Sequence, residues 1–501
     1  MIIVFTQHCY IYAQKIPNWQ NKDLQTDSVF GISADKAYVQ LLKGKKSKPV
    51  IVAVIDGGID TLHDDLVSVL WHNPHKKRFD NGTFGWSYIG SDHGSVRYDN
   101  LELTRQVRMH QSKDTSVLTA DELNRYHALK QELERKLGNG KRQIQGLQSF
   151  ISVLNGMLKK MGKETPSLAD VQAYDPESPA EAQVIRMLTR ALSEKNDFLS
   201  FKEEQLDKPM KEFEALVSCQ LNTAFDPRAE FVGDNYNNSS ERFYGTPDND
   251  GPDPTHGTHV AGIIGAVRNN GIGINGVADN VRLLSIRAVP DGDERDKDIA
   301  NAIIYAADHG ARIINMSFGK PYSYDKKVVD DAVRYGLSKD VLFIQAAGND
   351  NKNIDLATNF PNRKFTDGKV AGSWIVVGAS GPKDDLNLKG AFSNYGKDAV
   401  DVFAPGVQIY SSIPGSKYAY FDGTSMAAPV VSGLAALIWE YYPRLSAAQV
   451  KNIILKSVVR VGHPVNLVTE NGIRRVSFNE LCVTGGIINA FQALELAATF
   501  K

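Results

Sequence analysis

The sequence predicts an α/β fold: a doubly wound, mostly parallel sheet with an inserted α-helical subdomain. Three observations favour it. Short apolar runs are typical of buried parallel strands, helical patterns separate several of these runs, and a long middle region shows helical periodicity with few strand signals. The chain has 501 residues, of which 42% are hydrophobic and 23% charged, so it is able to bury a large core and global disorder is excluded.

The first predicted strand is Val50–Ile55, an unbroken apolar run expected to be covered on both faces of a sheet. Similar runs follow at residues 282–286, 312–316, 341–346, 374–377 and 400–403. Between them, Lys297–His309 places its apolar residues on one helical face and is closed by Gly310, a usual C-terminal stop. This alternation predicts that reactive groups gather beyond the carboxyl ends of the strands.

The domain organisation follows from where this alternation holds. Residues 14–100 and 226–501 are predicted to form one α/β domain. Residues 101–225 are predicted to be an antiparallel helical insertion within that domain. Residues 1–13, an apolar stretch that ends in small Ala13, are expected to be a truncated signal segment, with an ordinary N-terminal tail as the alternative.

The first helix of the insertion is predicted to begin at Thr119, because Thr119 and Glu122 form a capping-box pair. It is expected to run to Leu137 and to be broken by Gly138-Asn139-Gly140, since glycine disfavours a helix interior.

Two further helices are predicted in the insertion. Apolar residues from Ile144 to Met161 recur at alternating steps of three and four, which indicates a helix with a heptad-like seam. Another helix is expected to start at Pro179 and to continue past Leu199, kinked or split by Pro209.

Charge, hydropathy and cysteine content limit the classes of partner and the compartment that the sequence allows. The net charge is −1 and the pI is about 6.8, so the chain has no basic footprint for nucleic acid. No apolar stretch is long enough to span a membrane, and with the N-terminal segment this predicts a secreted or periplasmic protein. Cys9 falls in that segment. Cys219 and Cys482 are expected to be buried free thiols, with a disulfide between them as the alternative.

Three widely separated segments carry candidate chemistry: Val54–Asp60, His256–Gly262 and Gly423–Pro429. They hold an aspartate after the first strand, a histidine at the start of a helix, and a serine ahead of an apolar helical stretch. An acid, an imidazole and a hydroxyl are the parts that turn a serine into a nucleophile at neutral pH. Taken singly, such a serine is usually a helix cap and such an aspartate a turn former.

The order Asp, His, Ser and the residues that flank each position resemble the subtilisin-like serine peptidases. The resemblance covers residues 45–90 and 235–501 and fails between them. It implies a serine endopeptidase that hydrolyses protein or peptide substrates through an acyl-enzyme and needs no cofactor for its chemistry. Ser425 is then the nucleophile, His256 the general base, and Asp56 the partner of the imidazole.

The resemblance also implies how a substrate is held. Asn349 resembles the side-chain donor of the family's oxyanion hole, where the alternative is a simple turn after a strand. Ile314–Gly319 looks like the family's substrate-binding edge strand, with Ser317, Phe318 and Gly319 as walls of the pockets.

Two segments of the sequence are candidate metal sites. Asn269–Gly276 resembles a loop that in many relatives holds calcium, which implies Asp65 and Asn270 as candidate ligands of a structural calcium ion. A metal-free, glycine-rich turn is the alternative. His259 follows His256 by three positions, but no carboxylate stands at zinc-ligand spacing, so His259 is expected to be structural.

The role of the insertion and two other functions stay open. Family members are commonly made with a folding-assisting propeptide, which we expect to be absent because only 55 residues precede Asp56. The insertion is predicted to compensate for it or to guard the cleft. One alternative function is an inactive scaffold that binds a partner through the insertion. Another is a peptide ligase or other acyl transferase that uses the same acyl-enzyme.

Overall fold

The computed structural model describes residues 16–74, 77–112, 118–193 and 197–500. The chain divides into two compact units: a helical unit, residues 98–226, and an α/β unit, made of residues 12–97 with 227–501. The expected signal segment, residues 1–13, and Cys9 lie outside the described residues. Cys219 and Cys482 are both free, Cys482 buried and Cys219 half-buried, so no disulfide joins them.

Over the described part of the chain, nine strands form the main sheet of the α/β unit, in the order β12-β15-β9-β8-β7-β6-β1-β5-β2. Their bounds are β1 Val50–Asp56, β2 Gly85–Ser87, β5 Val281–Arg287, β6 Ile313–Met316, β7 Leu342–Ala346, β8 Trp374–Ser380, β9 Val402–Pro405, β12 Val459–Arg460 and β15 Gly486–Ile487. Neighbouring strands are parallel except β12 and β15. Since β1 lies between β5 and β6, the strand order reverses there. The predicted doubly wound, mostly parallel sheet is confirmed.

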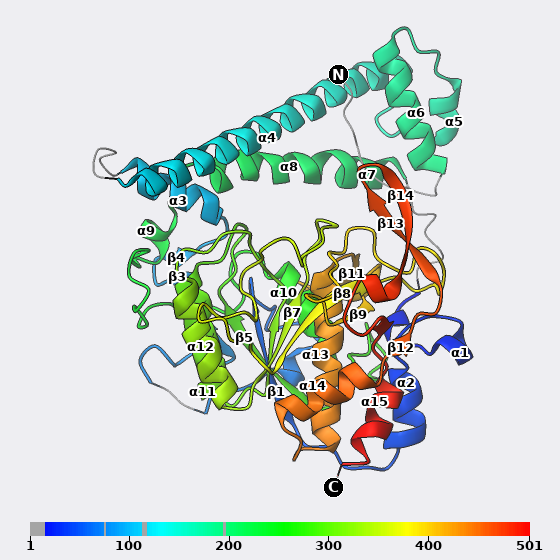
Figure 1. Ribbon diagram of the computed structural model, residues 1–501. Helices are drawn as coiled ribbons and strands as arrows, with labels where there is room; N and C mark the ends of the chain where they lie inside the picture. The colour runs from blue at the N-terminus through cyan, green and yellow to red at the C-terminus, as the bar shows by residue number, and fades with distance from the viewer. Residues whose placement is uncertain (1–15, 75–76, 113–117, 194–196, 501) are drawn as a thin grey trace. The chain divides into compact units, whose positions relative to one another are not determined.

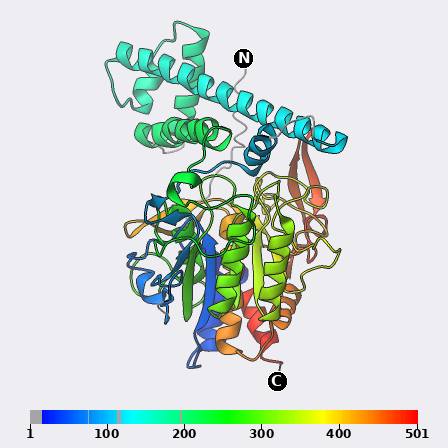
Figure 2. The same ribbon diagram turned by 90° about the vertical axis from the view of Figure 1, so that its left-hand side faces the viewer.

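Helices cover both faces of this sheet (Figures 1 and 2). One face carries α10 (Thr255–Gly265) and α13 (Thr424–Tyr441), and the other carries α11 (Asp296–Asp308) and α12 (Lys326–Ser338). Alternating residues of β1 supply both cores: Val52 and Val54 pack with α10 and α13, whereas Ala53 and Ile55 pack with α11 and α12. Burial on both faces explains why β1 has no polar residue before Asp56.

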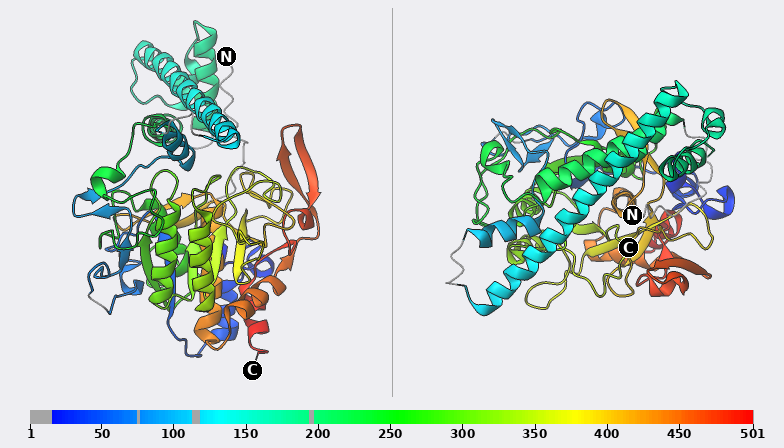
Figure 3. Two further views of the ribbon diagram at one scale, coloured as in Figure 1. Left: turned by 60° about the vertical axis from the view of Figure 1, so that its left-hand side comes forward. Right: turned by 90° about the horizontal axis from the view of Figure 1, so that it is seen from above.

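Smaller elements complete the α/β unit. Its outer helices are α1 (Leu24–Asp27), α2 (Ala34–Ala37), α9 (Arg228–Phe231), α14 (Ala447–Lys456) and α15 (Ala490–Ala497). In the ranges that the structure describes, three antiparallel hairpins accompany the main sheet: β3 (Gly90–Ser91) with β4 (Gly94–Ser95), β10 (Ile409–Ile413) with β11 (Lys417–Phe421), and β13 (Pro464–Thr469) with β14 (Gly472–Ser477). The β13–β14 hairpin extends away from the main sheet (Figure 3).

The helical unit is built around one long helix, α4, which runs from Ala120 to Met161 (Figure 1). The other helices are α3 (Glu102–Gln111), α5 (Leu168–Ala173), α6 (Pro179–Ser193), α7 (Phe198–Lys202) and α8 (Lys208–Ala215). Leu147, Phe150 and Leu154 of α4 share a buried core with Val184 and Leu188 of α6. The capping box of Thr119 and Glu122 is present, as predicted.

The expected break at Gly138-Asn139-Gly140 is wrong, because α4 continues through it. Gly140 is buried, and a Cβ at this position would lie 2.8 Å from a methyl carbon of Val217. The glycine therefore serves the close approach of a neighbouring helical segment, whose packing offsets the cost of about 1 kcal/mol that each interior glycine carries. The helix that starts at Pro179 is also shorter than expected, because extended backbone at Asp197 caps a new helix there.

A buried ion network holds the segment of the α/β unit that follows the helical unit. Arg228 is 1% exposed and contacts Asp234 at 2.7 Å and Asp298 at 2.8 Å, both buried. Burial alone would raise the pKa of Asp234, but Arg228, with Arg295 and Lys297 near it, holds that pKa well below its ordinary value. Asp234 is therefore charged, and both carboxylates form ion pairs with the guanidinium of Arg228.

Arg228→Ala is expected to lower the free energy of unfolding by about 3–5 kcal/mol, because it leaves Asp298 buried without its cation and removes one of the three cations around Asp234. Urea and thermal unfolding followed by tryptophan fluorescence measure the change. Arg474→Ala is the control: this side chain is 63% exposed and 3.7 Å from Glu480, so its change is expected to stay within about 0.5 kcal/mol. Equal effects of the two substitutions would contradict the prediction.

Candidate active site

Asp56 ends β1 at the carboxyl edge of the sheet and is 3% exposed. Its Oδ1 accepts the backbone N–H of Gly57 at 2.7 Å. Its backbone carbonyl accepts the N–H groups of Ala288 at 3.0 Å and Val289 at 3.2 Å, just after β5. These bonds fix the carboxylate in a single direction before any partner side chain is considered.

That partner is His256, the second residue of α10. Its Nδ1 lies 2.8 Å from Asp56 Oδ1 and 3.0 Å from Oδ2. With Nδ1 donating to the carboxylate, the neutral ring keeps Nε2 as an acceptor on a side chain that is 45% exposed. Gly257 permits the approach, because a Cβ there would lie 2.1 Å from the carbonyl oxygen of Gly58.

The pKa values of the two histidines in this segment are shifted in opposite directions. Desolvation lowers the pKa of His256, but the charge of Asp56 and its hydrogen bond outweigh it, so the pKa is raised above the ordinary 6.5. His259 is fully buried, stacks on Phe421 and bonds the carbonyl of Ala419 through Nε2 at 3.1 Å. Burial lowers the pKa of His259 to about 3, so this ring is neutral. Its setting is structural, as expected.

Ser425 is the second residue of α13 and is held against the end of β6. Its hydroxyl donates to the carbonyl oxygen of Ser317 at 3.0 Å, and the Ser317 hydroxyl donates back to the carbonyl of Ser425 at 2.9 Å. A hydroxyl has one hydrogen, so Ser425 gives it to Ser317 rather than to the His256 ring. Ser317 also lines the same cavity of about 240 Å³ as Asp56 and His256. Asp56 and His256 thus line one cavity with Ser317, and Ser425 is hydrogen-bonded to Ser317.

Asn315 is a positioning residue that the sequence analysis missed. It is fully buried; its Nδ2 donates to Ser317 Oγ at 3.0 Å, and its Oδ1 accepts the hydroxyl of Ser432 at 2.8 Å. The network therefore ties β6 to α13 from within the core. A signal for it was present in the sequence, because Asn315 is a polar residue within an otherwise apolar run, Ile-Ile-Asn-Met.

Asn349 follows β7 and is exposed. Its Oδ1 accepts both the backbone N–H and the hydroxyl of Thr424, at 2.9 Å each. The amide is therefore oriented with Nδ2 as its free donor, because no described residue accepts a hydrogen bond from that atom. Asn394, 4% exposed, braces the same loop by bonding the carbonyl of Ala347 and the N–H of Asp350. Neither Thr424 nor Asn394 was singled out from the sequence.

The expectation of an edge strand at Ile314–Gly319 is wrong for its first half. Residues 313–316 are β6, which lies between β1 and β7, so their backbone groups are already used. Periodicity marks a buried strand but not its place in the sheet order. Only the extension over Ser317, Phe318 and Gly319 leaves this ladder; Ser317 is buried, Phe318 half-buried and Gly319 exposed.

The candidate calcium ligands are occupied by hydrogen-bond donors. Asp65 is fully buried and accepts Asn270 Nδ2 at 2.7 Å, and the Ile274 N–H and the Tyr418 hydroxyl at 3.2 Å each. The amide direction is fixed because Asn270 Oδ1 accepts the N–H of Ile272. Calcium requires oxygen ligands, whereas hydrogens surround this carboxylate. As arranged, the residues do not fit a calcium ion.

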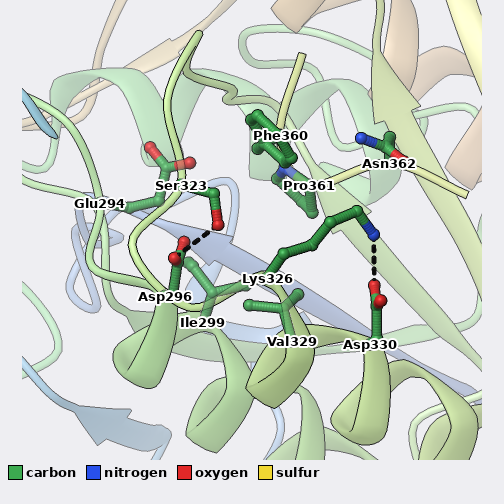
Figure 4. A pocket seen from close by; sticks show the side chains of 10 residues that line it. All are labelled: Glu294, Asp296, Ile299, Ser323, Lys326, Val329, Asp330, Phe360, Pro361 and Asn362. Atoms are coloured by element: carbon green, nitrogen blue, oxygen red, sulfur yellow. Dashed lines mark hydrogen bonds and ion pairs between the residues drawn. The ribbon is translucent and has the colours of Figure 1, made fainter. Parts of the chain in front are cut away.

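A second hollow lies among α11, α12 and the loop after β7 (Figure 4). Its polar side chains serve one another: Ser323 donates to Asp296 and Lys326 pairs with Asp330. A volume of about 10 Å³ leaves room for about one water molecule. Burial raises the pKa of Glu294 in its wall to about 8. The hollow is too small for a substrate side chain.

No group of three or more His, Cys, Asp or Glu side chains in the described ranges is arranged to hold a metal ion. Among the helices of those ranges, none has the length and apolar character needed to cross a bilayer.

Comparison with known proteins adds the following matches. A model of the subtilase family matches residues 47–479. A thermophilic serine proteinase from Bacillus sp. (strain AK1) is 46% identical over 184 residues, 36% of this chain and 42% of the relative. Alkaline elastase YaB from Bacillus sp. (strain YaB) is 36% identical over 210 residues, 42% of this chain and 51% of the elastase. Subtilisin BL from Lederbergia lenta is 35% identical over 209 residues, which are 41% of this chain and 71% of the subtilisin. The chain spans less than two thirds of the first two relatives.

Asp56→Asn is expected to lower the pKa of His256, because it removes the charge that outweighs desolvation. An NMR titration of the histidine ring signals measures this directly. His259 is the internal control: it is already neutral, with a pKa of about 3, and its signals are expected to stay constant between pH 5 and pH 8 in both proteins. A His256 pKa that does not change would show that Asp56 does not stabilise the charged ring.

Proposed function

This chain belongs to the subtilase family, and on that premise we propose that it is a serine endopeptidase. It would hydrolyse peptide bonds of protein or peptide substrates through an acyl-enzyme, with Asp56, His256 and Ser425 as its catalytic triad. Asn349 would act as an oxyanion donor. The observation that carries the proposal is the hydrogen bond of 2.8 Å between His256 Nδ1 and Asp56, beside a cavity lined by Ser317, the residue to which Ser425 is hydrogen-bonded.

The first half of the reaction forms the acyl-enzyme. Ser425 Oγ attacks the scissile carbonyl carbon while His256 Nε2 takes the hydroxyl proton. Asp56 holds the ring through Nδ1 and stabilises the imidazolium without taking the proton. When the tetrahedral intermediate collapses, His256 gives the proton to the leaving amine and the C–N bond breaks. Water then attacks the ester by the same steps, which releases the acid and restores Ser425.

The oxyanion of each intermediate needs donors already in place. The N–H groups in the first turn of α13 have no intrahelical acceptor, and the helix dipole adds partial positive charge there. The backbone N–H of Thr424 donates to Asn349 Oδ1, so the next N–H, that of Ser425, would be the one available to the oxyanion. The Nδ2 of Asn349 would be the second donor, since Thr424 fixes the opposite end of the amide.

The hydroxyl of Ser425 must leave the Ser317 carbonyl before it attacks. Its hydrogen bond of 3.0 Å to that carbonyl describes the free protein. Rotation about one side-chain bond of a half-exposed serine takes picoseconds to nanoseconds, far less than a catalytic cycle. The resting bond therefore does not limit the rate.

Reaction with a fluorophosphonate probe is expected to label the folded chain and to disappear in Ser425→Ala, because the probe needs an activated serine oxygen. Mass spectrometry locates the adduct. Ser317→Ala is not a suitable control because Ser317 touches the nucleophile, so Ser338→Ala, at an exposed position of α12 outside the site, serves instead and should keep labelling. A folded wild-type chain that stays unlabelled would favour the alternative of an inactive scaffold.

Asn349→Ala is expected to reduce kcat about 10²–10³-fold with little change in KM, the loss known for the same kind of donor in a subtilisin. The reason is that the amide would contact the oxyanion only after attack. Steady-state hydrolysis of a chromogenic peptide measures both constants. Asn387→Ala, at an exposed loop position outside the site, is the control and should leave both constants unchanged. A loss confined to KM would contradict the assigned role.

A further inference from the structure

The cavity beside His256, here called the His256 cavity, has a charged wall that the reaction does not use. Its volume is about 240 Å³, enough for a long side chain. The lining residues are Asp56, Gly57, Arg97, Asp253, His256, Arg287, Val289, Pro290, Asp291 and Ser317. Asp56 is occupied by the His256 ring. The charges left to describe are those of Asp253, Asp291 and the two arginines.

Two carboxylates face this space. Asp253 is fixed by the backbone N–H of Thr255 at 3.2 Å, next to the start of α10, and its side chain is 35% exposed. Asp291 follows β5, and its side chain is 50% exposed. Within the described ranges, the ion-pair partner of its carboxylate is Arg97, whose Nε lies 3.5 Å from Oδ2. Desolvation and the charge of Asp253 both raise the pKa of Asp291, so the pair is short of positive charge.

Arg97 satisfies this pair only in part. It lies 3.0 Å from Asp253 but 3.5 Å from Asp291, and its side chain is 46% exposed. A long, half-exposed arginine that bridges two acids at the surface is held weakly. Arg97 therefore lies where a positive charge is favoured, but its single charge is shared between two carboxylates.

The other arginine is committed elsewhere. Arg287 is 2% exposed, and its donors go to the carbonyl oxygens of Gly57, Ile89 and Val96 and to the hydroxyl of Ser87. No carboxylate among the described residues lies within ion-pair distance of it. Its role is to tie backbone segments together behind the cavity, so it acts on Asp291 only at longer range and forms no ion pair with Asp253 or Asp291.

The direction in which an extended substrate runs through the site decides which of its side chains enters the His256 cavity. Successive side chains of an extended peptide point to opposite faces. If the residue before the scissile bond faces the extension over Ser317–Gly319, the next residue upstream faces the opposite side, where His256 and Asp291 lie. That residue enters the His256 cavity.

We propose that the His256 cavity is a subsite that selects a lysine or arginine two residues before the scissile bond, with Asp253 and Asp291 as the residues that determine this specificity. The inference rests on the proposed peptidase function. A substrate ammonium or guanidinium group supplies the charge that Arg97 supplies incompletely in the free protein. The chain is therefore a peptidase with an acidic subsite beside its general base.

Peptides that differ only at that position test the proposal. With lysine against leucine there, wild type is expected to show a kcat/KM ratio of about 10, the value of roughly one partly desolvated charge pair. Asp291→Asn and Asp253→Asn should each bring the ratio toward 1. Arg97→Gln should raise it, because it removes the competing cation. A merely structural role for these residues would not move the ratio in opposite directions.

The control is Asp331→Asn, a surface carboxylate on α12 paired with Lys327, which should leave the ratio unchanged. Raising the ionic strength should lower the wild-type ratio, because half-exposed charges are screened. Fluorophosphonate labelling of every variant separates the two proposals. Labelled protein that cleaves both peptides at the same rate overturns the acidic subsite and leaves the peptidase standing. Labelled protein that cleaves neither peptide overturns both.

Discussion

The hydrogen bond between His256 and Asp56 is the contact on which the rest of the site depends. It joins residues 200 positions apart, so it exists only if the carboxyl end of β1 and the start of α10 meet. The sheet supplies one half of this condition, since backbone bonds from the segment after β5 fix Asp56. Gly257 supplies the other half, because any side chain there would collide with the backbone at Gly58. Ser425 and Asn349 are then arranged around a pair that packing has already oriented.

Much of the fold could be read from the sequence because its signals are local. The run Val50–Ile55 is buried on both faces, and such strands carry their periodicity openly. The motifs around Asp56, His256 and Ser425 were readable because small residues flank each polar one. Three features were hidden for physical reasons. The place of β6 between two other strands depends on pairing distant in sequence, the continuity of α4 through Gly140 depends on packing against Val217, and the hydrogen of Ser425 goes to an acceptor that no pattern specifies. The donors around Asp65 were equally invisible, because a loop's composition does not say which way its amides point.

Two buried arginines show how differently the α/β unit compensates a cation. Arg228 is matched by carboxylates, which makes a closed network that holds the chain where it returns from the helical unit. Arg287 is matched by carbonyl oxygens instead, and its burial lowers its pKa to about 10. Carbonyls satisfy the donors but bring no negative charge. Among the described residues, the carboxylates Asp253 and Asp291 in the neighbouring cavity wall therefore have Arg97 rather than Arg287 as their ion-pair partner, next to a histidine whose pKa is raised.

The central position of β1 also has a consequence during biosynthesis. Both of its neighbours, β5 and β6, leave the ribosome more than 200 residues after it. At translation rates of about 5–20 residues per second, an apolar strand with two unpaired edges waits roughly 10–40 seconds for its partners. The helical unit, whose contacts are close in sequence, is made during that interval and is able to form first. A newly made chain therefore carries an exposed, aggregation-prone segment next to an already folded appendage, and a holdase chaperone that shields Val50–Asp56 would be most useful in that window.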